Sequence, residues 1–369
     1  MIKKRKFRTF FSLTVIPVAV LGVLNFETVR SFCTQSYLGL IKMPLLVGAV
    51  SKPPLYFAQN SARIFEEEAG VLRIQKGIWN IDHPIILDGP LTISPGTTLN
   101  FAPNSYLIVR GTLTALGSKL APITIQGQTG RLWKGIYVYE ADSSSKLENV
   151  YISNTNALVD GYLQLSGGVT FYESDVVIGN SVFKGSQAED GLNIINSEFT
   201  LTNTQFKDMR SDAFDSDFSH GTIKASNFNA IGGDAIDFSG TKSWVEYPHI
   251  YNVRDKAISA GENSIVNVLG GYVKSVGVAA ASKDGSVVDI VDTRIENVSL
   301  FGLMTYVKKT SYSSPTLNAY NLSWGDDVSK QSSNNWIRQV GTVLTIDGQK
   351  VPEKDLDVKA LYKGTVMSK

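Results

Sequence analysis

The sequence predicts an all-β solenoid, a right-handed single-stranded parallel β-helix, and two repeating columns of apolar residues predict it. Both columns recur at a step of 22 or 23 residues. A fixed period in this range is typical of a solenoid, in which each repeat buries its apolar face against its neighbours. The first column is Phe183, Phe206, Phe228, Ile250, Val273 and Ile295, and the second is Ile178, Leu201, Ile223, Val245, Val268 and Ile290.

A repeat of this length has room for three short strands and three turns, which together make one coil. Successive coils of such a helix lie about 4.8 Å apart, and parallel crossovers are right-handed as a rule. From residue 71 to 325 short apolar stretches alternate with Gly, Pro, Asn and Asp, and no helical period of useful length occurs. Of the 369 residues 43% are hydrophobic and 19% charged, which predicts a packed core.

The two ends of the solenoid are expected to be capped, because an open end would expose unpaired strand edges. Residues 61–325 are predicted to form the β-helix with its N-terminal cap, a short helix over 61–68 between Ser61 and Gly70. Residues 326–369 are predicted to form a C-terminal cap and tail, with a hairpin that turns at Asp347 and Gly348.

The N-terminus has the layout of an export signal. Residues 1–8 are strongly basic, and an apolar stretch follows to Phe26. We interpret residues 1–30 as an uncleaved signal-anchor that contacts the membrane through residues 9–26, and residues 31–60 as a tether. A cleaved signal peptide is the close alternative, and a cytosolic protein with an apolar N-terminal helix is a third. The expected location is extracytoplasmic, in a bacterial periplasm or at the cell surface.

Charge and cysteine content limit the possible partners. The formal net charge is +1, so nothing indicates the concentrated basic face of a nucleic-acid-binding protein, and no nucleic-acid partner is predicted. The single cysteine, Cys33, allows no internal disulfide.

Aspartates gather in two adjacent repeats. Side chains alternate across a strand, so Asp215, Asp217 and Asp237 point outward if Phe214, Ser216, Ile236 and Phe238 point inward. Asp212 and Asp234 lie at the turns that enter these strands. We therefore predict a candidate site whose catalytic residues are Asp212, Asp215, Asp234 and Asp237, and whose substrate-binding residues are Asp217, His220, Arg210 and Arg254.

Stacked carboxylates repel each other, so something must offset their charge. One answer is a bound Ca²⁺ held by Asp215 and Asp237. A second is a raised pKa on one carboxyl group, as general-acid chemistry needs, and a third is solvation with neighbouring arginines. A purely structural alternative is strongest for Asp190, Asp212 and Asp234, because Asp is favoured in turns. It is weaker for Asp215, Asp217 and Asp237, since Asp is disfavoured in strands.

Two parts of the chain resemble known β-helices. The segment 77–135, with its runs Leu91-Thr-Ile-Ser-Pro-Gly and Gly111-Thr-Leu-Thr-Ala-Leu-Gly, is similar to the opening coils of many exported bacterial β-helix domains. The later coils resemble the repeats of the pectin-lyase-like superfamily. That superfamily includes lyases, hydrolases, epimerases, adhesins and scaffolds, so the resemblance implies the fold and leaves the activity open.

One short segment resembles a particular enzyme class, the polygalacturonases. The stretch Asp190-Gly-Leu-Asn-Ile is similar to their Asn-Thr-Asp-Gly segment, but the next coil carries one aspartate, Asp212, where two are expected. Their Gly-His-Gly motif is missing, because His220 is out of register, so no polygalacturonase is predicted. The sequence predicts an extracytoplasmic β-helix that binds or processes an acidic polysaccharide by lyase, hydrolase or epimerase chemistry. A non-catalytic scaffold or adhesin-like surface protein is the alternative, and whether the chain is an enzyme is left open.

Overall fold

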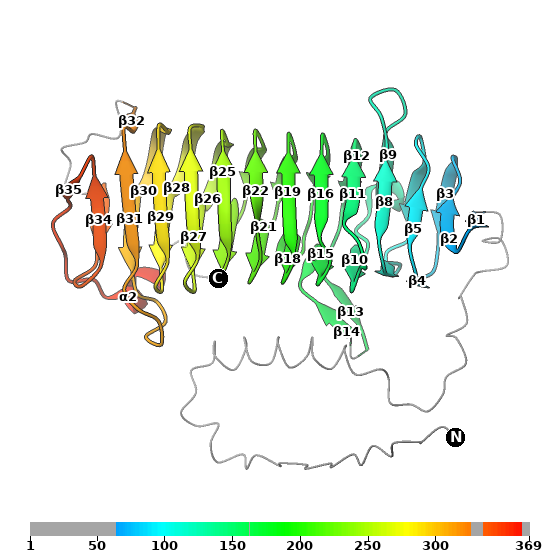
Figure 1. Cartoon of the computed structure of the whole chain (residues 1–369), viewed down its shortest axis with the longest axis horizontal. Coiled ribbons are helices and arrows are strands. Elements are labelled where there is room, and N and C mark those ends of the chain that lie inside the picture. Colours follow the sequence, from blue (N-terminus) through cyan, green and yellow to red (C-terminus); the bar gives the residue numbers. More distant parts are fainter. Residues whose placement is uncertain (1–63, 162, 326–334, 364–369) are drawn as a thin grey trace, which may run out of the picture. The chain divides into compact units, whose positions relative to one another are not determined.

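The chain forms a row of coils built from short parallel strands (Figure 1). The computed structural model describes residues 64–161, 163–325 and 335–363. Each coil contributes one strand to each of three faces, which we call faces A, B and C in chain order. The predicted parallel β-helix is confirmed, with the right-handed sense that parallel crossovers take.

Face A is the fourteen-stranded sheet, in which twelve parallel strands lie between an antiparallel strand at each end. Its parallel strands are β2 Val71–Ile74, β5 Leu91–Ile93, β8 Leu113–Leu116, β11 Ser145–Glu148, β16 Val176–Gly179, β19 Glu198–Thr202, β22 His220–Lys224, β25 Lys242–Glu246, β27 Ile265–Leu269, β29 Val287–Val291, β31 Thr316–Tyr320 and β34 Val343–Ile346.

Faces B and C make up the nineteen-stranded sheet, because three long strands run through both: β26 His249–Gly261, β28 Tyr272–Lys283 and β30 Arg294–Tyr306. Face B also contains β3 Ile78–Ile81, β6 Thr98–Phe101, β9 Ile123–Gly127, β12 Val150–Ser153, β17 Val182–Lys184, β20 Gln205–Met209, β23 Asn227–Ile231 and β32 Ser323–Trp324. Face C also contains β4 Ile85–Asp88, β7 Leu107–Arg110, β10 Ile136–Tyr139, β15 Gly167–Tyr172, β18 Asp190–Ile195, β21 Asp212–Asp217, β24 Ile236–Ser239 and β33 Trp336–Arg338.

The two apolar columns predicted from the sequence form the core in the predicted register. Phe206 pairs with Phe183 on one side and Phe228 on the other, and its ring stacks on both at centroid distances of 5.1 and 4.8 Å. The second column is likewise continuous through face A, from Ile178 to Ile290. Both columns are buried, so the repeat that the sequence shows is the repeat of the core.

The coils turn at corners with left-handed backbone conformation. In the coil that contains β19, Asn196 and Asn203 flank the strand with φ of +49° and +48°, and asparagine adopts this conformation more readily than most residues. A ladder of buried hydroxyl groups fixes the corner between faces C and A. Each accepts a hydrogen bond of 2.8–3.3 Å from the backbone N–H of the preceding rung, in the series Ser174, Ser197, Ser219, Thr241, Ser264 and Ser286.

Both ends of face A are closed by tight antiparallel hairpins. At the C-terminal end β34 turns through Asp347 and Gly348 into β35 Gln349–Lys350, as predicted. At the N-terminal end the predicted helix over 61–68 is wrong: residues 65–68 form strand β1 Phe65–Glu68, which turns through Ala69 and Gly70 onto β2. The unpaired edge of β2 needs backbone partners, and a strand supplies them where a helix cannot. Residues 61–63 lie outside the described residues.

Three small elements lie outside the coils. A hairpin of β13 Leu158–Asp160 and β14 Leu163–Leu165 extends away from the row of strands (Figure 1). The helix α2 Val358–Tyr362 follows the last coil, and the side chain of Asp357 caps it by accepting a hydrogen bond from the N–H of Ala360 at 3.0 Å. A 3₁₀ turn, η3 Gln128–Gly130, follows β9.

The predicted signal-anchor over 1–30 and tether over 31–60 lie outside the described residues. No helix within the described parts of the chain is both long and apolar enough to cross a bilayer. Parallel pairing continues beyond residue 325, since β33 pairs with β30 and β34 pairs with β31. The solenoid therefore extends one coil into the region predicted to be the C-terminal cap.

Candidate functional site

Alternation along β21 and β24 places the aspartates on the outer side of face C. Phe214, Ser216, Ile236 and Phe238 point inward and are fully buried. Asp215, Asp217 and Asp237 occupy the positions between them and are half-buried. Asp215 pairs directly with Asp237 in the parallel register. The predicted orientation and stacking of these carboxyl groups are therefore confirmed.

These aspartates belong to a longer outward column, which we call the central column of face C. Register pairs join its members strand by strand, because each lies opposite the next across a parallel ladder. From β15 to β26 they are Thr170, Asn193, Asp215, Asp237 and Ser259. The amide Nδ2 of Asn193 donates hydrogen bonds to Asp190 at 3.2 Å and to Asp215 at 3.3 Å.

A second set of carboxylates, at the corner between faces B and C, joins successive coils. Asp212 Oδ1 accepts a hydrogen bond from the N–H of Asp234 at 2.8 Å, and Asp234 Oδ1 accepts one from the N–H of Lys256 at 2.9 Å. Gly233 makes this possible, because a Cβ there would lie 2.0 Å from Asp212 Oδ1. Asp212 and Asp234 are each only 2% exposed. These contacts are structural, but they join one coil to the next, whereas the turn alternative expects a bond to a nearby N–H of the same turn.

Lys256 partly neutralises this corner. Its Nζ lies 3.1 Å from Asp234 Oδ1 and 2.8 Å from Asp255 Oδ2, and all three side chains are buried. Burial by itself lowers the pKa of Lys256, but the two carboxylates outweigh burial and the pKa is raised. The ammonium group is therefore a fixed positive charge.

Lys283 supplies the second positive charge, from farther away. It follows Ser282, which pairs with Ala260, and a Cβ on the next residue of that strand, Gly261, would lie 3.4 Å from Lys283 Cε. The side chain crosses this bare position and brings its Nζ to 3.6 Å from Asp237 Oδ1. Asp237 also raises the pKa of Lys283 against the effect of burial. An ammonium group at this distance favours the ionised form of a carboxyl group.

Two of the outward carboxyl groups and one at the corner resist ionisation. Burial, followed by the charges of Asp217 and Asp190, raises the pKa of Asp215 well above the ordinary value. Burial, with the charges of Asp237 and Glu262, raises the pKa of Asp217 to about 7. Burial and Asp234 raise the pKa of Asp255 to about 7 as well. The face thus contains carboxyl groups with raised pKa values beside Asp237, which lies next to an ammonium group.

Two elements cover face C on either side of the aspartates. The hairpin β13–β14 packs over Tyr106, Ile108 and Tyr137, and the hydroxyl of Tyr106 donates to Asp160 at 2.8 Å. On the other side α2 and Leu356 pack over an apolar cluster of Val278, Ala281, Met304, Tyr306 and Ile337. The half-buried aspartates lie on the strands between these two coverings.

The predicted site residues fall into two groups. Asp212, Asp215, Asp217, Asp234 and Asp237 come together on face C and at its corner. His220 lies instead on face A, where it is exposed and its Nε2 is 3.6 Å from Glu198.

The predicted arginines, Arg210 and Arg254, are exposed near the corner between faces B and C. Among the described residues, no hydrogen bond or ion pair joins either of them to the aspartates. Within the described parts of the chain, Lys256 and Lys283 are the cations that form ion pairs with these aspartates. Neither lysine was predicted as a site residue. Lys283 gave no signal, because it reaches Asp237 from two strands away.

Calcium binding at Asp215 and Asp237 stays a prediction. Among the described residues no group of three or more His, Cys, Asp or Glu side chains is arranged to hold a metal ion. Lys283 provides one alternative to a metal, because its ammonium group accompanies Asp237.

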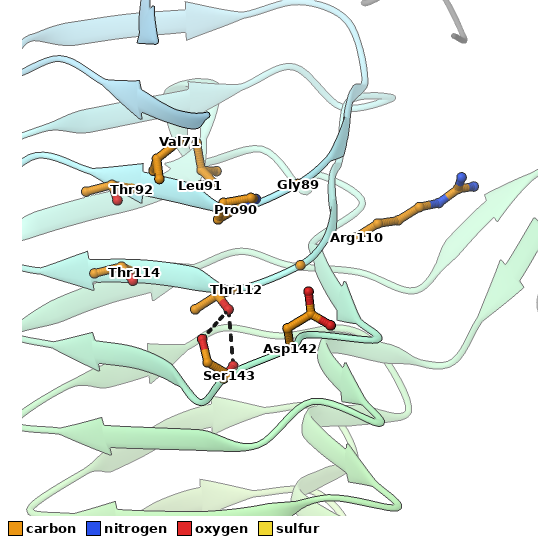
Figure 2. Close-up of a pocket in the computed structure, with 11 residues that line it drawn as sticks. Val71, Gly89, Pro90, Leu91, Thr92, Arg110, Thr112, Thr114, Asp142 and Ser143 are labelled. Carbon is orange, nitrogen blue, oxygen red and sulfur yellow. Dashed lines mark hydrogen bonds between the residues drawn. The ribbon is translucent and has the colours of Figure 1, made fainter. Parts of the chain in front are cut away.

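A hollow of the surface lies on other coils, at the corner between faces C and A (Figure 2). Gly89, Pro90, Arg110 and Asp142 line it, and the hydroxyl of Thr112 hydrogen-bonds to Ser143. The side chain of Arg110 points away from it and bonds to Asp88 and Tyr139. The hollow shares no residue with the aspartate cluster, and none of its residues matches a predicted site residue.

Comparisons with known proteins find likeness in the fold. No protein-family model matches the chain, and no curated protein matches it. Solved structures that resemble it include the catalytic domain of Agl-KA, at 13% identity and a TM-score of 0.44, over 75% of this chain and 62% of that one. The periplasmic alginate epimerase AlgG matches at 9% identity and 0.38, over 77% and 80%.

The Dettilon tailspike protein matches at 9% identity and a TM-score of 0.35, over 75% of this chain and 61% of that one. The chain therefore spans about three fifths of the length of the Agl-KA domain and of the tailspike. At these identities no activity is transferred from any of them.

Proposed function

We propose that this protein hydrolyses glycosidic bonds at the outward carboxyl groups of β21 and β24. The observation that carries the proposal is the set of Asp215, Asp217 and Asp237, which lie half-buried on adjacent coils between two coverings. Glycoside hydrolysis uses a pair of carboxyl groups, one protonated and one ionised. Asp215 and Asp237 support this proposal, because they are two carboxyl groups that lie next to each other in the central column.

The environments of the two stacked aspartates separate their roles. Asp215 has a strongly raised pKa and is the proton donor to the oxygen of the scissile bond. Asp237 lies beside the ammonium group of Lys283 and is the ionised partner. It either activates a water molecule or attacks the sugar directly. Asp217, with a pKa of about 7, is the nearest second source of a proton.

Hydrolysis fits this face better than lyase or epimerase chemistry. Those reactions begin when a basic group removes a proton from a sugar carbon. The lysines that contact the aspartates, Lys256 and Lys283, are held as protonated ion-pair partners with raised pKa values, so neither is available as a base near neutral pH. The carboxyl groups are therefore the acid and base of the site.

The test is product release from a panel of neutral, basic and acidic polysaccharides. Wild-type protein is expected to release reducing sugar from at least one, and Asp215→Asn to lose about 100-fold or more of that rate, because general-acid catalysis contributes at least this much. Asp208→Asn is the matched control, since Asp208 lies in β20 on face B, is exposed and pairs with Lys184 at 3.7 Å. Full activity in Asp215→Asn, or no cleavage of any polymer, would contradict the proposal.

A non-catalytic scaffold is the second candidate, and one observation favours it. Hydrogen bonds at the corner between faces B and C join Asp212 to Asp234 and Asp234 to Lys256, so they connect three coils. The ammonium group of Lys256 also pairs with Asp234. An acidic face could exist for this purpose alone. If the protein is such a scaffold, it cuts no polymer, and Asp215→Asn changes only its stability.

Calcium binding to Asp215 and Asp237 is kept as a separate proposal. A ligand that binds only the folded state raises the melting temperature. Millimolar Ca²⁺ should therefore raise the melting temperature of the wild type and have less effect on Asp237→Asn. Equal melting temperatures with and without Ca²⁺ would contradict calcium binding at these two aspartates.

We also propose, from the basic and apolar N-terminal residues alone, that the protein works outside the cytoplasm. Fractionation of cells that express the full chain tests this. The protein is expected in the membrane or periplasmic fraction, and recovery in the soluble cytosol would contradict it.

A further inference from the structure

Three buried polar atoms of the central column have no hydrogen-bond partner among the described residues. They are Thr170 Oγ1, Asn193 Oδ1 and Ser259 Oγ. The side chains are 6%, 4% and 0% exposed. Buried polar atoms are nearly always paired, and leaving one without a partner is unfavourable. Their placement in one column, on both sides of Asp215 and Asp237, indicates a common explanation.

The register shows that these atoms border the carboxyl groups directly. Asn193 is the partner of Asp215, and Ser259 is the partner of Asp237. Ser259 points outward, because its neighbours Ile258 and Ala260 belong to the core. The amide of Asn193 already uses its Nδ2 on Asp190 and Asp215, so what it still offers is an acceptor oxygen. A partner for this column must therefore donate hydrogen bonds.

The charge of the cluster indicates what kind of donor fits. Two lysines, Lys256 and Lys283, contact the cluster of seven aspartates Asp190, Asp212, Asp215, Asp217, Asp234, Asp237 and Asp255. Three of the seven have raised pKa values. Among the described residues, carboxyl groups therefore outnumber the ammonium groups that contact them, and neighbouring carboxylates contribute to each of the three raised pKa values.

We propose that the central column binds an amino sugar, a glycan unit that carries a protonated amine together with hydroxyl groups. The proposal rests on the proposed function for its location, and it names the substrate class. The ammonium group of the sugar would donate to the carboxylates and to Asn193 Oδ1, and its hydroxyl groups would bond to Ser259 Oγ and Thr170 Oγ1. A uronate would instead bring a further negative charge to a negative face.

Binding is tested with three oligosaccharides of equal length, made of glucosamine, of N-acetylglucosamine and of galacturonate. Calorimetry is done at slightly acidic pH, where the glucosamine amines are protonated. The glucosamine oligomer is expected to bind at least about tenfold more tightly than either of the others, which is the effect of one good charge-assisted hydrogen bond. Its affinity should fall as salt is added, since opposite charges make the contact.

Two variants test the column itself. Ser259→Ala and Asn193→Leu should each weaken glucosamine binding, and thermal melting verifies that each is folded. If Asn193→Leu does not fold, Ser259→Ala alone decides, because it removes one oxygen atom. Asn318→Leu is the matched control, an amide in an outward column of face A that bonds to Asp289 at 2.9 Å, and it should bind as the wild type does.

These experiments distinguish a failure of the binding proposal from a failure of the cleavage proposal. Tight binding of the glucosamine oligomer without any cleavage would overturn the proposed hydrolysis and keep this inference. Equal or tighter binding of the galacturonate or N-acetylglucosamine oligomer would overturn the inference even if a polymer is cut. Failure of all three to bind, or unchanged binding in Ser259→Ala, would overturn it too.

Discussion

Lys256 shows how a single residue allows a carboxylate-rich corner to be buried. Its ammonium group lies within hydrogen-bond distance of Asp234 and Asp255, and all three side chains are at most 5% exposed. Buried charges are tolerated only when they are paired and hydrogen-bonded. The backbone N–H of Lys256 adds a further bond to Asp234. This residue therefore links the coil of β26 to the coil of β24 by two separate contacts.

Removing this ammonium group should be strongly destabilising. Lys256→Met leaves two buried carboxylates without their cation, which costs about 3–5 kcal/mol of unfolding free energy in comparable cases. Urea unfolding at neutral pH measures it. The control Lys224→Met breaks an exposed pair with Glu246 at 3.0 Å and should cost about 1 kcal/mol or less. Equal losses for the two variants would show that Lys256 does not hold the corner.

The raised pKa of Asp217 predicts how stability changes with pH. The folded pKa is about 7 and the unfolded value is about 3.9, so between them the folded state binds a proton that the unfolded chain releases. This stabilisation is complete below about pH 4 and is lost as the pH rises through about 7. The wild type should therefore melt at a higher temperature at about pH 5 than at about pH 8, where the raised group has ionised.

Asp217→Asn should reduce this difference, and it should raise the melting temperature most at the higher pH. Asp208→Asn serves as the control and should keep the wild-type profile. Parallel pH profiles for the wild type and Asp217→Asn would mean that Asp217 does not carry the proton.

At the scale of residues, the sequence predicted the aspartates and missed their cations. The apolar columns fix the register, and this register stacks Asp215 on Asp237. The period and the alternation of side chains were therefore sufficient to predict the position of both aspartates. Lys283 is different, because its contact depends on a long side chain that crosses Gly261. Neither period nor residue type shows the direction of such a side chain.

Among the elements, the two hairpins that close the ends of face A have turns of the same kind. Each turns through two residues of positive φ, Ala69 and Gly70 at one end and Asp347 and Gly348 at the other. The C-terminal turn has the Asp-Gly pair that is typical of tight hairpins, and it was predicted. The N-terminal turn has Ala in place of Asp, and the three glutamates before it favour a helix by propensity. Pairing with β2 outweighs that propensity.

The two coverings of face C were not predicted, for different reasons. The hairpin β13–β14 interrupts the repeat, and its only signal is the Asp160-Gly161 pair at its turn. The helix α2 is five residues long and carries no period. Its position comes from apolar side chains that fit Val278, Ala281 and Met304, which only the folded molecule shows.

The docking of α2 can be tested with one substitution. Leu361→Asp places a charge against the apolar cluster, so the helix should detach, binding of a hydrophobic dye should increase and the melting temperature should fall. Lys359→Asp alters the charge on the exposed side of the same helix and should leave both unchanged. An unaltered dye signal in Leu361→Asp would show that α2 does not cover the cluster.

Over the whole molecule, each coil is stabilised by its neighbours. The stacked rings of Phe183, Phe206 and Phe228 join three coils through the core. Because a solenoid has contacts between adjacent repeats and few beyond them, its stability is close to a sum of repeat and interface terms. This is also why a single period in the sequence is enough to predict the fold.

Phe206→Ala should therefore damage the solenoid locally first. The cavity should cost about 3–5 kcal/mol, and hydrogen exchange should accelerate in β17, β20 and β23 before it does so in distant coils. Tyr320→Ala, on the exposed side of face A, should change stability by about 0.5 kcal/mol or less. A uniform loss of protection along all coils would indicate a single cooperative unit instead.

The central claim is that face C keeps Asp215 protonated, as a proton donor, beside an ionised Asp237. Carbon-13 NMR of the aspartate carboxyl groups tests it without a substrate, and comparison with Asp215→Asn identifies the resonance. We predict that Asp215 releases its proton well above the ordinary aspartate range, because burial and neighbouring carboxylates oppose its ionisation. A titration midpoint within the ordinary range would contradict it.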